Sequence, residues 1–166
     1  MNFEEYRKHD AVGLAELVKT KQIQPSELLE IAIQRTEVIN PKINAVVTKL
    51  YDIAKDQISK LDASAPLAGV PFLIKDLDAH LAGTRMTGGS RILKDYVSKE
   101  TSETVKRAIK SGLIIFGKTN TPEFGVTPFT EGKLLGTAHN PWNLEHTTGG
   151  SSGGAAAAVA AGILPM

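Results

Sequence analysis

Apolar positions in the first 65 residues recur with the three- and four-residue spacing of helices. The pattern predicts, in chain order, a helix over 11–19, a helix over 25–39, a short strand over 45–48 and a helix over 51–61. Asp10 is placed to cap the first helix, and Asn40-Pro41 is expected to end the second because proline disfavours helical geometry in the residue before it. These segments gather no catalytic group of side chains, so we expect residues 1–65 to be a helical scaffold.

After residue 66 the helical spacing gives way to continuous apolar runs. The segments predicted there are two buried strands, Val70–Ile74 and Leu113–Phe116, a helix over 103–111 between them, a helix start at Thr121-Pro122-Glu123, and a helix over 155–161. Strand, helix and strand in this order favour a parallel crossover. We therefore predict an α/β fold, with N-terminal helices over 1–65 and part of a mixed or parallel sheet flanked by helices over 66–166.

Composition and charge exclude several classes of function. Nineteen Lys and Arg residues against eighteen Asp and Glu residues give a net charge of +1, which argues against holding nucleic acid or an anionic membrane by bulk charge. The absence of cysteine excludes disulfides, thiolate nucleophiles and cysteine-ligated zinc. The first residues lack the apolar core of a secretory signal, and no apolar run has the length of a membrane span. We expect a cytoplasmic protein with no membrane partner.

Lys75 is the first candidate for chemistry, because it directly follows five apolar residues of a predicted buried strand. Ligands bind at such strand ends in open α/β sheets. Strand alternation places Asp76 on the face opposite to Lys75, so the two side chains need not pair. A desolvated, unpaired lysine loses its proton more easily and can then serve as a base. From position alone, a lysine that reaches the surface at a strand end is the more common alternative.

The second candidate is the loop Thr147–Gly154, in which four glycines surround Ser151 and Ser152. It leads directly into the predicted helix 155–161, so free N–H groups and the positive end of the helix dipole are expected beside the serines. Such a geometry stabilises an anion or a developing oxyanion. The phosphate-loop pattern is absent, and a flexible linker is disfavoured because the small-residue helix needs a packing partner. The residues alone leave a functional and a structural role of this loop equally open.

The four histidines carry less information. They lie at positions 9, 80, 139 and 146, show no metal-binding spacing, and form no HExxH motif. No G-x-S-x-G motif is present to anchor a Ser-His-Asp triad. We expect no metal and no cofactor.

Four segments in this order resemble the amidase signature family of serine hydrolases. They are Leu67–Asp76, Gly117–Gly125, Gly136–Trp142 and Gly149–Gly162. In style they look more like general amidases of the 6-aminohexanoate cyclic-dimer hydrolase kind than like the A subunit of a glutamyl-tRNA amidotransferase. The resemblance implies hydrolysis of a small-molecule amide by a Ser–Ser–Lys triad through an acyl-enzyme.

The resemblance also implies roles for individual residues. Lys75 matches the lysine that acts first as base and then as acid, and Ser151 matches the serine that relays protons between the lysine and the nucleophile. Gly150–Ser151 matches a cis peptide bond. Gly149, Gly150, Ser152 and Gly153 would shape the substrate and oxyanion loop.

The chain departs from the family pattern at the nucleophile. In the family this is a serine in a Gly-Gly-Ser loop further along the chain, and Met166 comes before such a loop. We therefore expect the N-terminal portion of an amidase, inactive alone, whose partner is its missing C-terminal portion or a second copy in a homodimer. The alternatives are an amidotransferase A subunit, which would act on a tRNA-linked substrate, and a non-catalytic module that binds an anion or a partner protein.

Overall fold

The computed structural model describes all 166 residues, and its elements follow the predicted order. The helices are α1 (Phe3–Tyr6), α2 (Ala11–Lys19), α3 (Pro25–Ile43), α4 (Tyr51–Ser59), α5 (Glu103–Lys110) and α6 (Gly153–Ala160), with 3-10 turns at Arg91–Leu93 and Glu123–Gly125. The strands are β1 (Val46–Lys49), β2 (Pro71–Lys75), β3 (Ile114–Thr119), β4 (Glu131–Gly132), β5 (Gly136–Thr137), β6 (His139–Asn140) and β7 (Asn143–Thr147).

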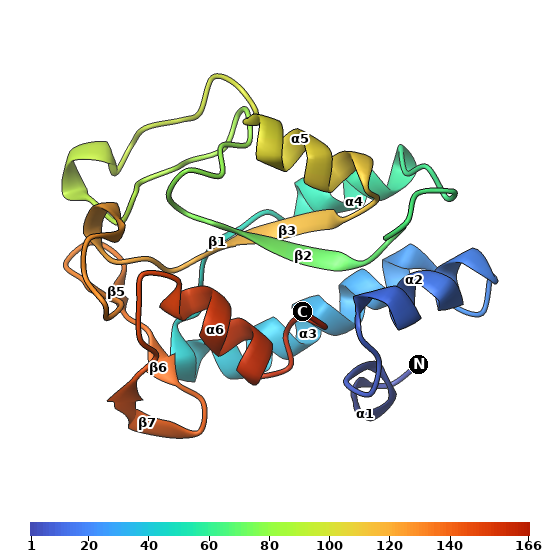
Figure 1. Cartoon of the computed structure of the whole chain (residues 1–166), viewed down its shortest axis with the longest axis horizontal. Coiled ribbons are helices and arrows are strands. Elements are labelled where there is room, and N and C mark those ends of the chain that lie inside the picture. Colours follow the sequence, from blue (N-terminus) through green and yellow to red (C-terminus); the bar gives the residue numbers. More distant parts are fainter.

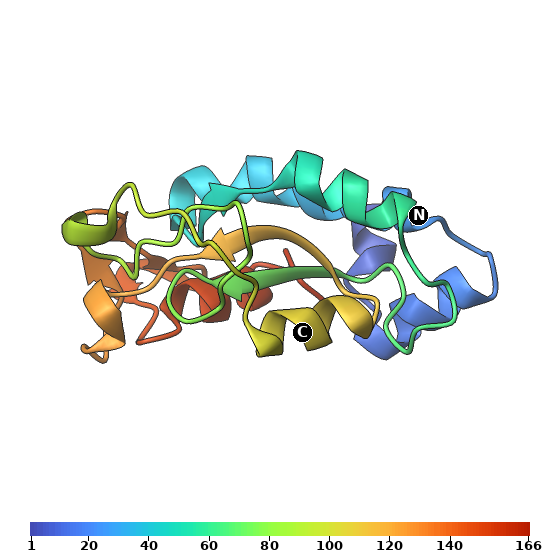
Figure 2. The ribbon, with the colours of Figure 1, turned by 90° about the horizontal axis from the view of Figure 1, so that it is seen from above.

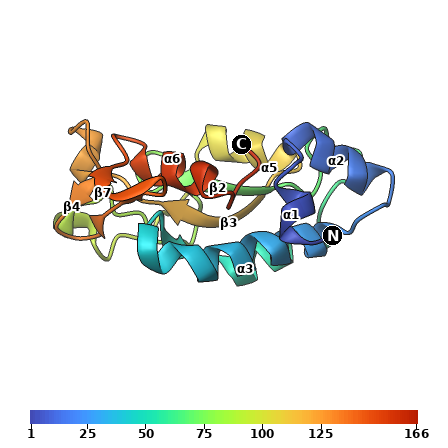
Figure 3. The same ribbon diagram turned by 90° about the horizontal axis from the view of Figure 1, so that it is seen from below.

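A three-stranded sheet with the order β1-β3-β2 forms the centre of the fold (Figure 1). β2 and β3 are parallel and are joined through α5, which confirms the predicted crossover, whereas β1 pairs with β3 antiparallel. Helices α3 and α6 pack against one face of the sheet, and α5 packs against the other (Figures 2 and 3). The α/β fold class with a mixed sheet is therefore confirmed.

The apolar side chains form three buried clusters that fix these layers. The largest joins α3, β3 and α6 through side chains such as Leu29, Phe116 and Ala158. A second holds α1 and α2 against the start of α3, and a third lies between α5 and the sheet. Because α6 belongs to the largest cluster, its start has a fixed position relative to the ends of β2 and β3.

The predicted end of the second helix at Asn40-Pro41 is wrong, because α3 continues through Pro41 to Ile43. Ile43 is fully buried, so the burial of its side chain outweighs the local cost of a proline inside a helix. The Asn40 side chain hydrogen-bonds both the N–H and the carbonyl of Val46, at 2.7 and 2.9 Å. Asn44, in the left-handed conformation with φ 47°, ends the helix instead.

The predicted helix start at Thr121-Pro122-Glu123 produces only a single 3-10 turn. Phe124 and Gly125 adopt left-handed conformations, with φ of 51° and 68°, which an α-helix cannot continue through.

The two small hairpins, β4–β5 and β6–β7, were not predicted, because their paired strands contain only two to five residues. No helix of the chain is both long enough and apolar enough to cross a membrane.

Candidate active site

The structure brings Lys75 and Ser151 together, although they lie 76 residues apart in sequence. Lys75 is the last residue of β2, and Ser151 lies in the loop that leads into α6. The Lys75 Nζ lies 2.8 Å from the Ser151 Oγ and 3.1 Å from the Ser152 Oγ. All three side chains therefore meet at the ends of the parallel strands, where the sequence predicted that ligands would bind.

Lys75 is half-buried and has no acidic partner within ion-pair distance. Burial lowers the pKa of its amine below the ordinary lysine value, and the nearby charge of Asp78 opposes this shift. The carboxylate of Asp76 is hydrogen-bonded to Thr87 instead. Lys75 is thus a lysine that loses its proton more easily than an ordinary lysine and whose hydrogen bonds go to hydroxyl groups.

The glycine-rich loop holds Ser151 and Ser152 beside Lys75. The peptide bond between Gly150 and Ser151 is cis, and Gly149 has a φ of 76°. Ser152 occupies the N-cap position of α6, but its hydroxyl contacts Lys75 and caps no amide of the helix. Both serine side chains are therefore directed to the amine.

The expectation that the first amides of α6 are free is wrong for two of them. The Gly153 N–H donates to the Thr130 Oγ1 at 3.2 Å, and the Gly154 N–H donates to the Asn120 carbonyl at 3.2 Å. Thr130 also donates its hydroxyl to the Gly149 carbonyl at 2.9 Å. These contacts fix the loop to the rest of the fold, so Gly153 has a structural task in addition to the role that the resemblance implies.

The sequence reasoning missed the residues that support the loop. Thr130 and Asn120 lie in irregular segments, where no local periodicity marks them. Thr121 donates its hydroxyl to the Ser151 carbonyl at 3.4 Å, and the backbone of Gly125 lies next to the Ser151 side chain. The one signal in the sequence was the family resemblance of the segment 117–125, which contains Asn120, Thr121 and Gly125.

On the face opposite to Lys75, where the sequence analysis placed Asp76, the structure has a buried group of charged and polar side chains that was not predicted. Asp76 and Lys118 are both fully buried, as is Thr87. Burial raises the pKa of Asp76, while the hydrogen bonds from Thr87 and the charges of Lys118 and Arg85 oppose that shift. Burial lowers the pKa of Lys118 to about 8, and its amine donates to the Arg85 carbonyl at 2.6 Å.

The lowered pKa of Lys118 predicts how stability changes with pH. In the unfolded chain the amine keeps its proton up to its ordinary pKa of 10.5, so between pH 8 and 10 the unfolded state binds more protons than the folded state. The free energy of unfolding is therefore expected to rise by about 2 kcal/mol from pH 7.5 to 9.5. Urea unfolding at several pH values measures this. Lys118→Met should remove most of the rise, because only the smaller contribution of Lys75 remains, and the exposed Lys110→Met should keep it. Equal slopes in both variants would contradict the assignment.

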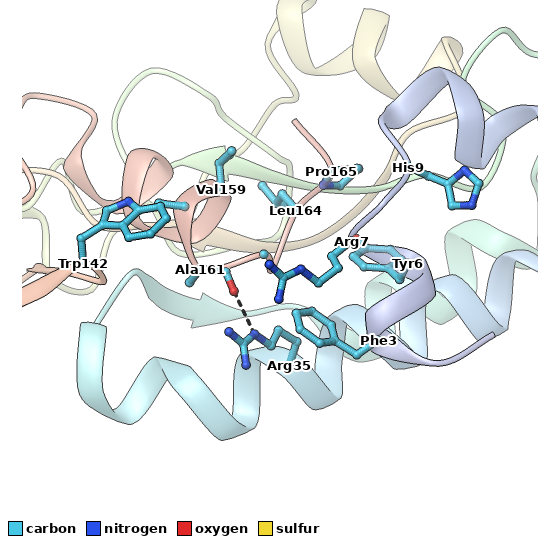
Figure 4. A pocket seen from close by; sticks show the side chains of 12 residues that line it. Phe3, Tyr6, Arg7, His9, Arg35, Trp142, Val159, Ala161, Leu164 and Pro165 are labelled. Atoms are coloured by element: carbon cyan, nitrogen blue, oxygen red, sulfur yellow. Dashed lines mark hydrogen bonds between the residues drawn. The ribbon is translucent and has the colours of Figure 1, made fainter.

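Two cavities differ in their relation to this site. One, of about 390 Å³, lies along β2 and has apolar walls from β2 and α5, and its lining includes Lys75, Thr119 and Ser152. The other, of about 360 Å³, lies away from Lys75 between α1, α3 and the end of α6 (Figure 4). There the Arg35 guanidinium donates to the Ala161 carbonyl at 2.8 Å and lies over the Phe3 ring. Nowhere in the chain do three or more His, Cys, Asp or Glu side chains gather in a way that could hold a metal ion.

Comparison with known proteins assigns the chain to a family. A model of the family Amidase matches residues 27–166, and the chain belongs to this family. It is 42% identical to a lipoamidase of Enterococcus faecalis over 98% of this chain and 22% of that protein. It is 43% identical to a 6-aminohexanoate-cyclic-dimer hydrolase of Paenarthrobacter ureafaciens, over 95% of this chain and 32% of that protein.

The solved structures agree with this assignment. The structure of a 6-aminohexanoate cyclic dimer hydrolase superimposes with a TM-score of 0.90 and 40% identity, over 94% of this chain and 32% of that one. The predicted resemblance to the amidase signature family and to this kind of amidase is confirmed. The chain spans about a third or less of the length of these relatives.

Proposed function

We propose that the chain supplies the base and the proton relay of an amidase that hydrolyses carboxamide C–N bonds. The observation that carries this proposal is the contact of 2.8 Å between the Lys75 Nζ and the Ser151 Oγ, made by an amine without an acidic partner. Membership of a family of amidases supports the reaction class. The substrate is a small or linear amide, and the reaction needs no cofactor.

In the proposed mechanism Lys75 acts in its neutral form. Ser151 passes its hydroxyl proton to the Lys75 Nζ and takes the proton of a nucleophilic serine, whose oxygen attacks the amide carbon. The protonated Lys75 then returns the proton through Ser151 to the leaving amine, so that the C–N bond breaks and an acyl-enzyme remains. Water hydrolyses this ester, with the same two residues moving its proton. Burial supports this sequence because it favours the neutral amine at the start of each cycle.

We place the nucleophile in a Gly-Gly-Ser loop outside these 166 residues, as the resemblance to the family implies. Ser152 is the other hydroxyl in contact with Lys75, at 3.1 Å. In the proposal it holds the amine in place as a second hydrogen-bond partner and does not attack the substrate. The loop from Gly149 to Gly153 then serves to present Ser151 to the nucleophile.

The proposal predicts that this chain has no amidase turnover alone and gains it when completed. The test compares the 166-residue chain with a chimera in which it replaces the matching third of the 6-aminohexanoate-cyclic-dimer hydrolase, a substitution supported by the TM-score of 0.90. Release of amine from the cyclic dimer and from a simple anilide measures turnover. The chimera is expected to hydrolyse at least one of them and the chain neither. Robust hydrolysis by the purified chain would overturn the placement of the nucleophile.

A further inference from the structure

Asp76, the residue directly after Lys75, is held on the opposite face of the sheet by two hydrogen bonds from one residue. Its carboxylate accepts from the Thr87 N–H at 3.1 Å and from the Thr87 hydroxyl. Its own N–H donates to the Thr119 carbonyl at 3.1 Å, which extends the pairing of β2 and β3 by one residue. The chain is therefore fixed on both sides immediately after the catalytic lysine.

Positively charged side chains lie near the Asp76 carboxylate on its own face of the sheet. An unpartnered carboxylate in a protein interior would carry a large desolvation cost. Lys118, on β3, and Arg85 favour its charged form electrostatically, and the Lys118 amine is anchored on the Arg85 carbonyl at 2.6 Å. Asp76 therefore has no need to pair with the Lys75 amine, whose nearest carboxylate influence is the exposed Asp78.

Fixation at this point matters because the Lys75 amine must meet two hydroxyl groups at hydrogen-bond distance. Such contacts weaken steeply when the donor moves. A lysine side chain has four rotatable bonds, so its amine stays in place only if its backbone origin does.

We propose that Asp76, clamped by Thr87, is a positioning residue that holds the end of β2 so that the Lys75 amine stays at the serine pair. The proposal deepens the proposed function and depends on it for its catalytic meaning. We call the hydrogen-bonded pair of Asp76 and Thr87 the clamp. Thr87 is its central residue, because the Thr87 hydroxyl donates to Asp76 and accepts from the Gly89 N–H at 3.1 Å. Neither Asp76 nor Thr87 would touch the substrate.

A purely electrostatic role of Asp76 predicts a different result from a positioning role. If the carboxylate acts on Lys75 through its charge, removing the charge lowers the pKa of the lysine and removing the Thr87 hydroxyl changes little. If the clamp positions Lys75, losing the Thr87 hydroxyl releases the amine towards water and its pKa rises. Thr87→Val keeps the charge and nearly the same shape, so it separates these cases.

The experiment measures the pKa of Lys75 in the chain by competitive acetylation with acetic anhydride between pH 7 and 11, followed by peptide mass spectrometry. Lys110, exposed on α5, is the internal reference. We expect a lowered pKa in the unmodified chain, a rise of about one pH unit in Thr87→Val, and an unchanged value in Thr87→Ser, which keeps the hydroxyl. The matched charge control, Asp78→Asn, should lower the pKa slightly. Should Thr87→Val fail to fold, Thr87→Ala removes the same hydroxyl without added bulk.

Each outcome separates this inference from the proposed function. A folded Thr87→Val chain whose Lys75 still titrates as in the unmodified chain would overturn the positioning role and leave the proposed base intact. A fall of the pKa in Asp76→Asn with no change in Thr87→Val would assign the effect to charge and also overturn it. If Lys75 of the unmodified chain already titrates at its ordinary value, the neutral base itself is refuted.

Discussion

Replacing Lys75 by methionine in the active chimera is expected to lower kcat/KM for amide hydrolysis by about 10³-fold. Methionine keeps much of the length and apolar character of the side chain and removes only the amine. The loss has a direct physical cause, since Ser151 would have no base to receive its proton at 2.8 Å. Steady-state rates of amine release over a range of substrate concentrations measure the effect, with circular dichroism to confirm that the variant folds.

Lys110→Met is the matched control, because it removes an exposed lysine on α5 in the same way. Its rate should equal that of the parent chimera. A Lys75→Met chimera with a rate within about tenfold of the parent would take Lys75 out of the proposed mechanism, because a general base contributes more than this. The pH profile of the parent adds a second readout: the rate should rise with pH as Lys75 loses its proton, and burial should place this limb below the ordinary lysine pKa.

The position of a site residue could be predicted from the sequence where that residue lies next to a recognisable local pattern. The apolar run before Lys75 predicts a strand end, and the glycines around Ser151 predict a loop before a helix. Because β2 and β3 run parallel, their carboxyl ends lie at the same edge of the sheet. The small residues of α6 allow the start of this helix to approach that edge. The meeting of the two residues thus follows from patterns that are visible in the chain.

The parts that escaped prediction depend on contacts between distant segments. Nothing near Thr130 marks it as the partner of Gly153, and nothing near Thr87 marks it as the partner of Asp76. The continuation of α3 through Pro41 has the same origin, because it is decided by burial in a core that the local sequence does not reveal. Predictions from local sequence patterns failed where tertiary packing outweighed the local conformational preference.

Gly154→Ala is expected to destabilise the chain by about 3 kcal/mol, although alanine normally favours a helix over glycine. A methyl group at this position would lie 2.6 Å from the Asn120 carbonyl oxygen and 2.8 Å from the Ala45 carbonyl oxygen. Both are backbone atoms of the tightly packed sheet end, so they cannot move aside as a flexible side chain could. Helix α6 must shift instead, and the hydrogen bond from the Gly154 N–H to Asn120 is lost.

The shift would also move Ser151 and Ser152 away from Lys75, so in the chimera we expect activity to fall together with stability. Gly13→Ala on α2 is the matched control, because its new methyl group would meet only side-chain atoms, the His9 Nδ1 at 3.2 Å and the Asp10 Oδ1 at 3.3 Å. The helix preference of alanine should then leave its stability unchanged or raise it by up to about 1 kcal/mol. Urea unfolding of both variants measures the difference. Equal midpoints for Gly154→Ala and the unmodified chain would show that α6 does not press on the sheet end, and the fixed approach of the serine loop to Lys75 would lose its structural basis.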